Sequence, residues 1–134
     1  MYVRVGAANV APFLSAIEKW PVVWNAPGWG STTSVRLRED FGSLLPGEWR
    51  EALLIGMKPG SLVPLHVDAL YKEPTTRTHV VLSTNPDCWS LHDGVWQQLE
   101  EGTLWEMDQT LPHASVNLGK TIRWHLVVDT LKPL

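Results

Sequence analysis

The spacing of apolar residues changes near residue 31. Within residues 10–20 the large apolar side chains recur at intervals of three and four, which is the spacing of one helix face. These side chains are Phe13, Leu14, Ile17 and Trp20. Pro21 follows directly, and the residue before a proline disfavours helical backbone angles. The pattern therefore predicts a short helix that ends before Pro21.

From residue 31 onward the chain consists of short apolar or alternating runs. The run at 34–38 alternates apolar and polar residues, and the run at 51–57 is continuous and stops at Lys58-Pro59-Gly60. Further runs lie at 63–70, 78–83, 102–107 and 121–129, separated by Pro, Gly, Asn and Asp. Many short strands with regular turn signals are typical of an all-β sandwich or barrel. We predict one all-β domain over residues 1–134, with a short helical N-terminal segment and about eight strands.

Composition and charge exclude several classes of protein. With 44% hydrophobic and 19% charged residues, the chain has the composition of a packed globular domain and not of a disordered one. A net charge of −3 argues against a nucleic-acid partner, which requires a basic surface. The chain contains no apolar run of membrane-spanning length and begins without a signal-peptide pattern, so we expect no membrane partner and a cytoplasmic location. The single cysteine, Cys88, excludes an internal disulfide and a zinc site built from cysteines.

The first candidate for chemistry is the segment His66-Val67-Asp68. Residues i and i+2 of a strand point to the same face, so the imidazole and the carboxylate would project together. A second histidine from a distant strand would complete the two-histidine, one-carboxylate set of non-haem iron oxygenases. The His-x-Asp pair alone is a weak signal, because it occurs by chance in many sequences.

The second candidate is His113, followed by the turn residues Asn117-Leu118-Gly119-Lys120 and then by Arg123. The turn predicts a hairpin. A three- or five-residue connection, or a bulge, would place His113 and Arg123 on one face together with Ser115 and His125. A guanidinium beside a metal-binding imidazole suits a bidentate hold on the distal carboxylate of a chelating dicarboxylic acid.

The third candidate is the pair Arg77 and His79, which would share one strand face and could donate to a second carboxylate. Several of these candidate residues also have a simpler structural interpretation. His79 and His125 would be hydrogen-bonded core histidines, and Arg123 taken alone would be a surface arginine. His92, in a turn-like segment, would be solvated.

The order and spacing of these pieces are more specific as a set than any one of them. The set resembles the aspartyl/asparaginyl β-hydroxylase family over roughly residues 52–130. Its members are Met57 to Gly60, His66, Arg77-Thr78-His79, Gly102, Asp108, His113, Asn117, Arg123 and Val127 to Asp129. The resemblance implies a double-stranded β-helix, which is a jelly-roll and cupin-like fold, and an oxygenase that depends on Fe(II) and 2-oxoglutarate.

The resemblance also implies a metal site. His66 and His113 match the two iron-binding histidines of the family. Asp68 is a departure, because the best-known animal members have a glycine at that position and only two protein ligands. Here the acid is present, so the full set of two histidines and one carboxylate can form.

The cosubstrate site follows from the same resemblance. Arg123 matches the arginine that holds the side-chain carboxylate of 2-oxoglutarate. Arg77 and His79 match the Arg-x-His pair that contacts the cosubstrate carboxylate near the metal. The reaction implied uses O2 to hydroxylate a C–H bond, with the β-carbon of an aspartyl or asparaginyl group, free or in a peptide, as the expected target.

Two alternatives remain open at this point. The first is a cupin-like isomerase or dioxygenase that binds a metal but not 2-oxoglutarate. The second is a non-catalytic jelly-roll module that uses exposed tryptophans to bind a sugar or a partner, although the eight tryptophans would most simply fill the core. The oxygenase would act on a small molecule or peptide, and the sequence does not fix an oligomeric state.

Overall fold

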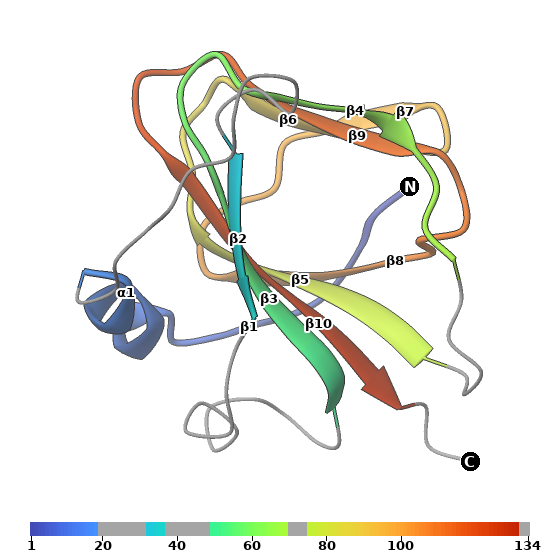
Figure 1. Cartoon of the computed structure of the whole chain (residues 1–134), viewed down its shortest axis with the longest axis horizontal. Coiled ribbons are helices and arrows are strands. Elements are labelled where there is room, and N and C mark those ends of the chain that lie inside the picture. The colour runs from blue at the N-terminus through green and yellow to red at the C-terminus, as the bar shows by residue number, and fades with distance from the viewer. Residues whose placement is uncertain (19–31, 37–48, 70–74, 132–134) are drawn as a thin grey trace.

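A computed structural model describes residues 1–18, 32–36, 49–69 and 75–131. The proposed helix end at Pro21 and three of the tryptophans (Trp20, Trp24 and Trp29) lie outside these residues. Within them, the chain forms two antiparallel β-sheets that face each other, with one short helix on the outside (Figure 1). No helix in the described ranges has the length and apolar character needed to cross a membrane.

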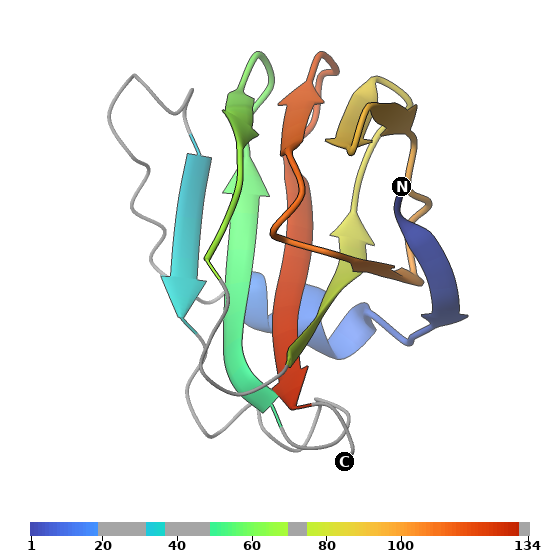
Figure 2. The same ribbon diagram turned by 90° about the vertical axis from the view of Figure 1, so that its right-hand side faces the viewer.

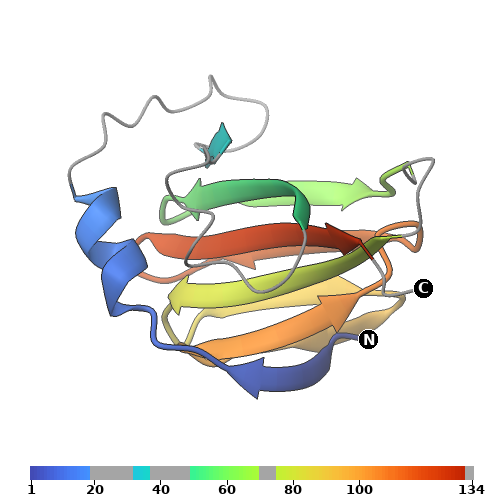
Figure 3. The ribbon, with the colours of Figure 1, turned by 90° about the horizontal axis from the view of Figure 1, so that it is seen from below.

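The larger sheet has six strands. In spatial order they are β1 (Val3–Ala7), β8 (Thr103–Met107), β5 (Thr75–Ser83), β10 (Arg123–Leu131), β3 (Trp49–Met57) and β2 (Thr32–Arg36). The smaller sheet has four strands, in the order β4 (Leu62–His66), β9 (His113–Asn117), β6 (Cys88–His92) and β7 (Val95–Gln97). Figure 3 shows β1 beside β8 at one edge of the larger sheet.

The fold prediction is confirmed, because the chain is mainly β with strands in two packed antiparallel layers. The helix α1 (Ala11–Ile17) lies within the predicted range. The described residues contain ten strands where about eight were expected. The missed strands are β1, which precedes the helix, and the short pair β6 and β7. The mixed polarity of β6 and β7, on either side of Asp93-Gly94, hid their strand pattern.

The central strand β10 is buried on both faces. Its residues Trp124, Leu126 and Val128 pack in the outer core with Phe13 of α1, and Figure 2 shows α1 lying behind the larger sheet. The alternate residues of β10 point to the opposite face, toward the smaller sheet. Because all seven residues from Arg123 to Asp129 are buried, the polar members of that inner row lie inside the protein.

The predicted hairpin after His113 is wrong. The turn is present, because the Asn117 side chain accepts from the Gly119 amide at 3.0 Å and donates to Thr121 O at 2.9 Å. However, β9 pairs with β4 and β6 while β10 pairs with β3 and β5, so the connection at 118–122 joins the two sheets. Arg123 is a buried residue at the start of β10 in the larger sheet, so strand parity across a hairpin does not decide its position.

Candidate active site

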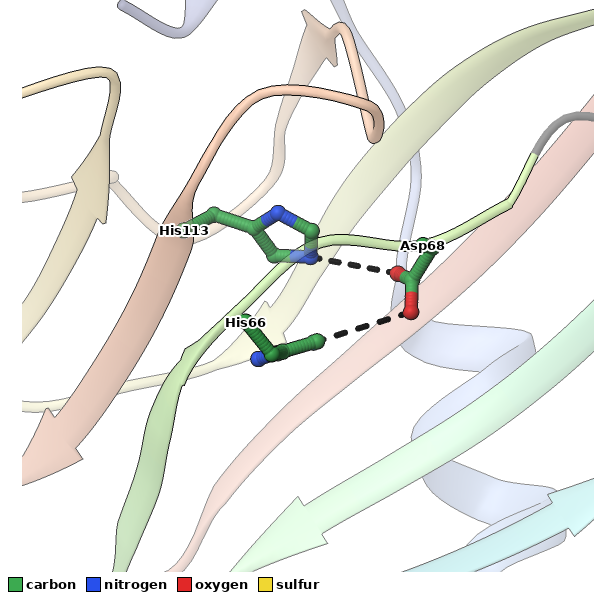
Figure 4. Close-up of side chains that lie close together, drawn as sticks. All are labelled: His66, Asp68 and His113. Atoms are coloured by element: carbon green, nitrogen blue, oxygen red, sulfur yellow. Dashed lines mark hydrogen bonds and ion pairs between the residues drawn. The ribbon is translucent and has the colours of Figure 1, made fainter.

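His66, Asp68 and His113 come together at one end of the space between the sheets. His66 ends β4 and its Cα pairs with that of His113, the first residue of β9. One potential ligand atom from each of the three residues lies within 4.8 Å of the others (Figure 4). Asp68 lies beyond the end of β4, not on it as expected, and its amide donates to Gln109 O at 2.8 Å. The structure thus brings together all three residues predicted to bind the metal.

Backbone carbonyls fix the orientation of both imidazoles. His66 Nδ1 lies 2.6 Å from Pro64 O, and His113 Nδ1 lies 2.8 Å from Leu111 O. A carbonyl oxygen only accepts, so Nδ1 carries the proton and Nε2 of the neutral ring keeps its lone pair. Such a bond from the second ring nitrogen is characteristic of metal-binding histidines.

These lone pairs converge on the Asp68 carboxylate. His113 Nε2 is 3.1 Å from Asp68 Oδ2, and His66 Nε2 is 3.8 Å from Asp68 Oδ1. Burial lowers the pKa of the His113 imidazole, with a smaller contribution in the same direction from His66, against the carbonyl of Leu111 and the charge of Asp68. Nε2 of the neutral His113 ring and Oδ2 of Asp68 are therefore two hydrogen-bond acceptors that face each other. A cation between them resolves this contact, and two imidazole nitrogens with one carboxylate suit Fe, Mn, Co, Ni or Zn.

Arg77 links the Asp68 carboxylate to the wall of the larger sheet. Its Nε and Nη2 donate to the two oxygens of Asp129 at 2.8 and 2.9 Å, and its Nη1 donates to Asp68 Oδ2 at 2.7 Å. Burial alone would lower the pKa of this guanidinium, but Asp129 and then Asp68 outweigh it and raise the pKa above its ordinary value. Arg77 thus stays charged and holds Asp68 beside the two histidines.

His79 is half-buried on β5 and pairs with the buried histidine His125. Its Nδ1 is 3.1 Å from Nδ1 of His125, and the two rings meet edge to face at 84°. Burial, and next the positive charge of Arg123, hold both pKa values well below the ordinary one. One ring therefore donates while the other accepts, and both are neutral. This confirms the interpretation of His125 as a hydrogen-bonded core residue, while His79 is hydrogen-bonded but only half-buried.

The depressed histidine pKa values predict that the metal-free protein loses stability in mild acid. The unfolded chain takes up protons near pH 6.5, whereas His79, His125 and His113 in the folded protein do so only at lower pH. Stability is thus lost as pH falls below about 6.5, by up to about 1.4 kcal/mol per pH unit for each histidine. Urea unfolding with a chelator between about pH 5 and pH 8 measures this slope. A free energy of unfolding that stays constant below pH 6.5 would contradict the burial of these rings.

Arg123 is a buried cation with no acidic partner in the described part of the chain. Arg123 is only 4% exposed, and its Nε has no hydrogen-bond partner in the described residues. Burial lowers its pKa to about 10, and Tyr2 and Cys88 oppose that change only in part. The guanidinium is therefore still charged at neutral pH. Because an uncompensated buried charge is costly, this side chain is suited to hold an anionic group.

Sequence reasoning misplaced one residue near this site. His92 was expected to be solvated, but it ends β6 at 3% exposure, pairs by its Cα with His113, and has its Nε2 2.8 Å from Asp108 O. The alternation of Cys88, Ser90 and His92, all buried, was the signal that could have found it. Tyr2 was also missed, and its ring packs against both His79 and His92.

Comparison with known sequences gives a family and one relative. A sequence profile described as aspartyl/asparaginyl beta-hydroxylase matches residues 33–133. L-proline cis-4-hydroxylase from Rhizobium meliloti (strain 1021) is 31% identical over 81 residues, which make up 60% of this chain and 29% of that protein. The match thus spans less than a third of the relative's length.

Comparison with solved structures confirms the cupin-like jelly roll. HygX from Streptomyces hygroscopicus, solved with nickel and 2-oxoglutarate bound, superposes with a TM-score of 0.75 at 13% identity and covers 99% of this chain and 83% of its own. The cupin domain of Schizosaccharomyces pombe Cnp3 gives a TM-score of 0.61 at 6% identity over 98% and 88%. A predicted oxalate decarboxylase of Thermotoga maritima gives 0.58 at 19% identity over 84% and 91%. At these identities the likeness establishes the fold.

Proposed function

Because the chain belongs to the aspartyl/asparaginyl β-hydroxylase family, we propose that it is an oxygenase that uses Fe(II), 2-oxoglutarate and O2 to hydroxylate a C–H bond. The observation that carries this proposal is that two features occur together in the interior of the protein. A cluster of three metal-ligand side chains lies at one end, and the buried cation Arg123 has no acidic partner among the described residues. Together they match a metal that is chelated by a dicarboxylic acid.

His66, Asp68 and His113 are the residues that would hold the iron. The chemistry supplied by bound Fe(II) and 2-oxoglutarate is the oxidation of an unactivated C–H bond by O2, with release of succinate and carbon dioxide. The protein contributes orientation. The carbonyls of Pro64 and Leu111 aim the two imidazoles, and Arg77 aims the carboxylate of Asp68.

Arg123 would pair with the far carboxylate of 2-oxoglutarate. A guanidinium can donate two parallel bonds to a carboxylate, and the buried setting strengthens both. The positive charge of Arg123 lowers the pKa of His79 more than the charge of Arg77 does. We propose that Arg77 and His79 contact the cosubstrate from the same strand, Arg77 from the metal side and His79 from nearer to Arg123.

The family description makes the β-carbon of an aspartyl or asparaginyl group, free or in a peptide, the first candidate for the hydroxylated position. The name of the relative, L-proline cis-4-hydroxylase, makes a free amino acid a reasonable form of substrate. A cupin enzyme that binds metal without 2-oxoglutarate is the alternative, and it assigns no role to the buried charge of Arg123.

The variant Arg123→Met tests the cosubstrate role. We expect it to weaken 2-oxoglutarate binding about 100-fold, because two charge-assisted hydrogen bonds are lost while the side-chain volume is nearly kept. Calorimetric titration of 2-oxoglutarate into the Mn(II)-loaded protein measures this affinity. Lys120→Met removes an exposed cation from the preceding loop and should leave binding unchanged. Equal affinity in Arg123→Met and wild type would reject the proposed role.

A further inference from the structure

Three connections between the two sheets meet at one end of the protein. They are residues 58–61 between β3 and β4, residues 84–87 between β5 and β6, and residues 118–122 between β9 and β10. Figure 2 shows the first and the last of these side by side at the top of the view. The amide of Gly60 donates to Asn117 O at 2.7 Å, and the amide of Leu118 donates to Asp87 O at 3.0 Å. These bonds hold the three connections together.

The side chain of Asn117, the last residue of β9, is fully buried at this end and uses its whole hydrogen-bonding capacity. Its Nδ2 donates to Met57 O and to Thr121 O, both at 2.9 Å. Its Oδ1 accepts from the amide of Gly119 at 3.0 Å and from Nδ2 of Asn85 at 3.1 Å. An asparagine side chain has two donor hydrogens and two acceptor lone pairs, so none is left unsatisfied. This one amide therefore ties the end of β3 to the connections at 84–87 and 118–122.

Asn85 supports the same contact from the neighbouring connection. Its Nδ2 also lies 3.0 Å from Thr121 O and 3.2 Å from Thr121 Oγ1. Gly119 leaves the room for this arrangement, because a Cβ at that position would collide with the Asn85 side chain. The contact between the two asparagines thus depends on a glycine beside them.

Both bonds donated by Asn117 Nδ2 bear on the position of Arg123. Met57 is the Cα partner of Arg123 on the neighbouring strand β3, and Thr121 lies two residues before Arg123 in the chain. At its other end, β9 begins with His113, one of the three proposed metal ligands. The strand that carries this histidine is therefore fastened, through the Asn117 amide, to the place where β10 begins with Arg123.

A ligand that bridges the metal and Arg123 requires a fixed distance between them. His113 belongs to the smaller sheet and Arg123 to the larger one, so their separation depends on how the sheets are joined. A dicarboxylic acid held at both ends has a set chain length, and a misplacement of about 1 Å in such a site can lower its function about 100-fold.

We propose that Asn117 is a positioning residue that sets the separation between Arg123 and the metal-binding strands, and thereby the length of the dicarboxylate that the site accepts. Asn117 acts through Arg123, because the hydrogen bonds of its own side chain are all made within the protein. The inference rests on the proposed function, which identifies the bridging ligand as 2-oxoglutarate.

The test compares 2-oxoglutarate with 2-oxoadipate, which is longer by one methylene, in calorimetric titrations of the Mn(II)-loaded protein. One methylene changes recognition in a well-fitted site by about 10- to 200-fold, so we expect the wild-type protein to prefer 2-oxoglutarate at least about tenfold. Asn117→Ala should lower this preference about tenfold, because Arg123 is no longer held at one distance from the metal. Its affinity for Mn(II) should stay at the wild-type value, since carbonyls of Pro64 and Leu111 orient the two imidazoles.

A milder variant and a matched control accompany this test. Asn85→Ala removes the support of Asn117 from a side chain that is only half-buried, so this variant should fold and should lower the preference about threefold, the equivalent of a weak hydrogen bond. Asn9→Ala makes the same change before helix α1, where Asn9 Oδ1 accepts from the amide of Ala11 at 3.2 Å. It should leave the preference unchanged.

The outcomes separate the inference from the proposed function. If Asn117→Ala and Asn85→Ala melt at lower temperature but keep the wild-type preference, Asn117 has a structural role alone and the positioning role is overturned. If Asn117→Ala does not fold, Asn85→Ala decides by the same criterion. Wild-type protein that binds Mn(II) but neither dicarboxylate would instead refute the proposed function, and with it the inference.

Discussion

Replacing Asp129 with asparagine is expected to lower the free energy of unfolding by about 3–5 kcal/mol. The Asp129 side chain is 4% exposed and accepts two of the hydrogen bonds of Arg77, whose own side chain is 15% exposed. An asparagine of the same shape keeps one acceptor but loses the negative charge. Of the acidic partners of this guanidinium in the described ranges, Asp68 then remains, and its side chain is 36% exposed. Urea unfolding at about pH 7.5 measures the loss.

A matched control separates this effect from the general cost of changing an acid to an amide. Asp87→Asn makes the same change at an exposed position and should alter stability by less than about 0.5 kcal/mol. The double variant Arg77→Met with Asp129→Leu removes both charges and should recover part of the loss. If Asp129→Asn were as mild as Asp87→Asn, the ion pair would not be the support of the inner wall that its geometry indicates.

Replacing Asp68 with alanine is expected to weaken divalent-metal binding by more than about 100-fold, which is the upper range for loss of an outer contact. The change removes one of three converging ligand atoms. It also leaves Nη1 of Arg77, which donates to Asp68 at 2.7 Å, as a positive charge facing the two imidazoles. Competition of the protein with a chromophoric chelator for Co(II) gives the affinity of each variant.

The control for this prediction is Asp87→Ala, which makes the same change in net charge at an exposed site. It should bind Co(II) as the wild type does. A site made by the two histidines alone would lose little affinity in Asp68→Ala. That result would exclude Asp68 as a ligand.

The metal-ligand cluster could be predicted only in part from local spacing. His66 and Asp68 are two residues apart, whereas His113 lies 45 residues beyond Asp68 and was assigned through the family resemblance. The contacts of Arg123 could not be derived that way, since they depend on β9 and β10 lying in opposite sheets, and no spacing rule reports which sheet a strand joins. The hairpin on which the prediction about its position depended is wrong, and the role of Arg123 beside the metal stays a prediction.

The burial of His92 was also beyond the sequence. This residue is buried where β6 pairs with β9, whereas its neighbours Asp93 and Gly94 indicated a solvated turn. Tertiary pairing thus buried a residue whose local sequence favoured exposure.

The most direct test of the central proposal is an anaerobic titration of metal-free protein with Fe(II) and then with 2-oxoglutarate. Chelation of Fe(II) by 2-oxoglutarate produces a weak visible charge-transfer band, so we expect this band in the wild-type protein. In Arg123→Met it should require much more cosubstrate. Iron that binds to the protein without giving the band at saturating 2-oxoglutarate would contradict the oxygenase and favour a metal-dependent cupin of another kind.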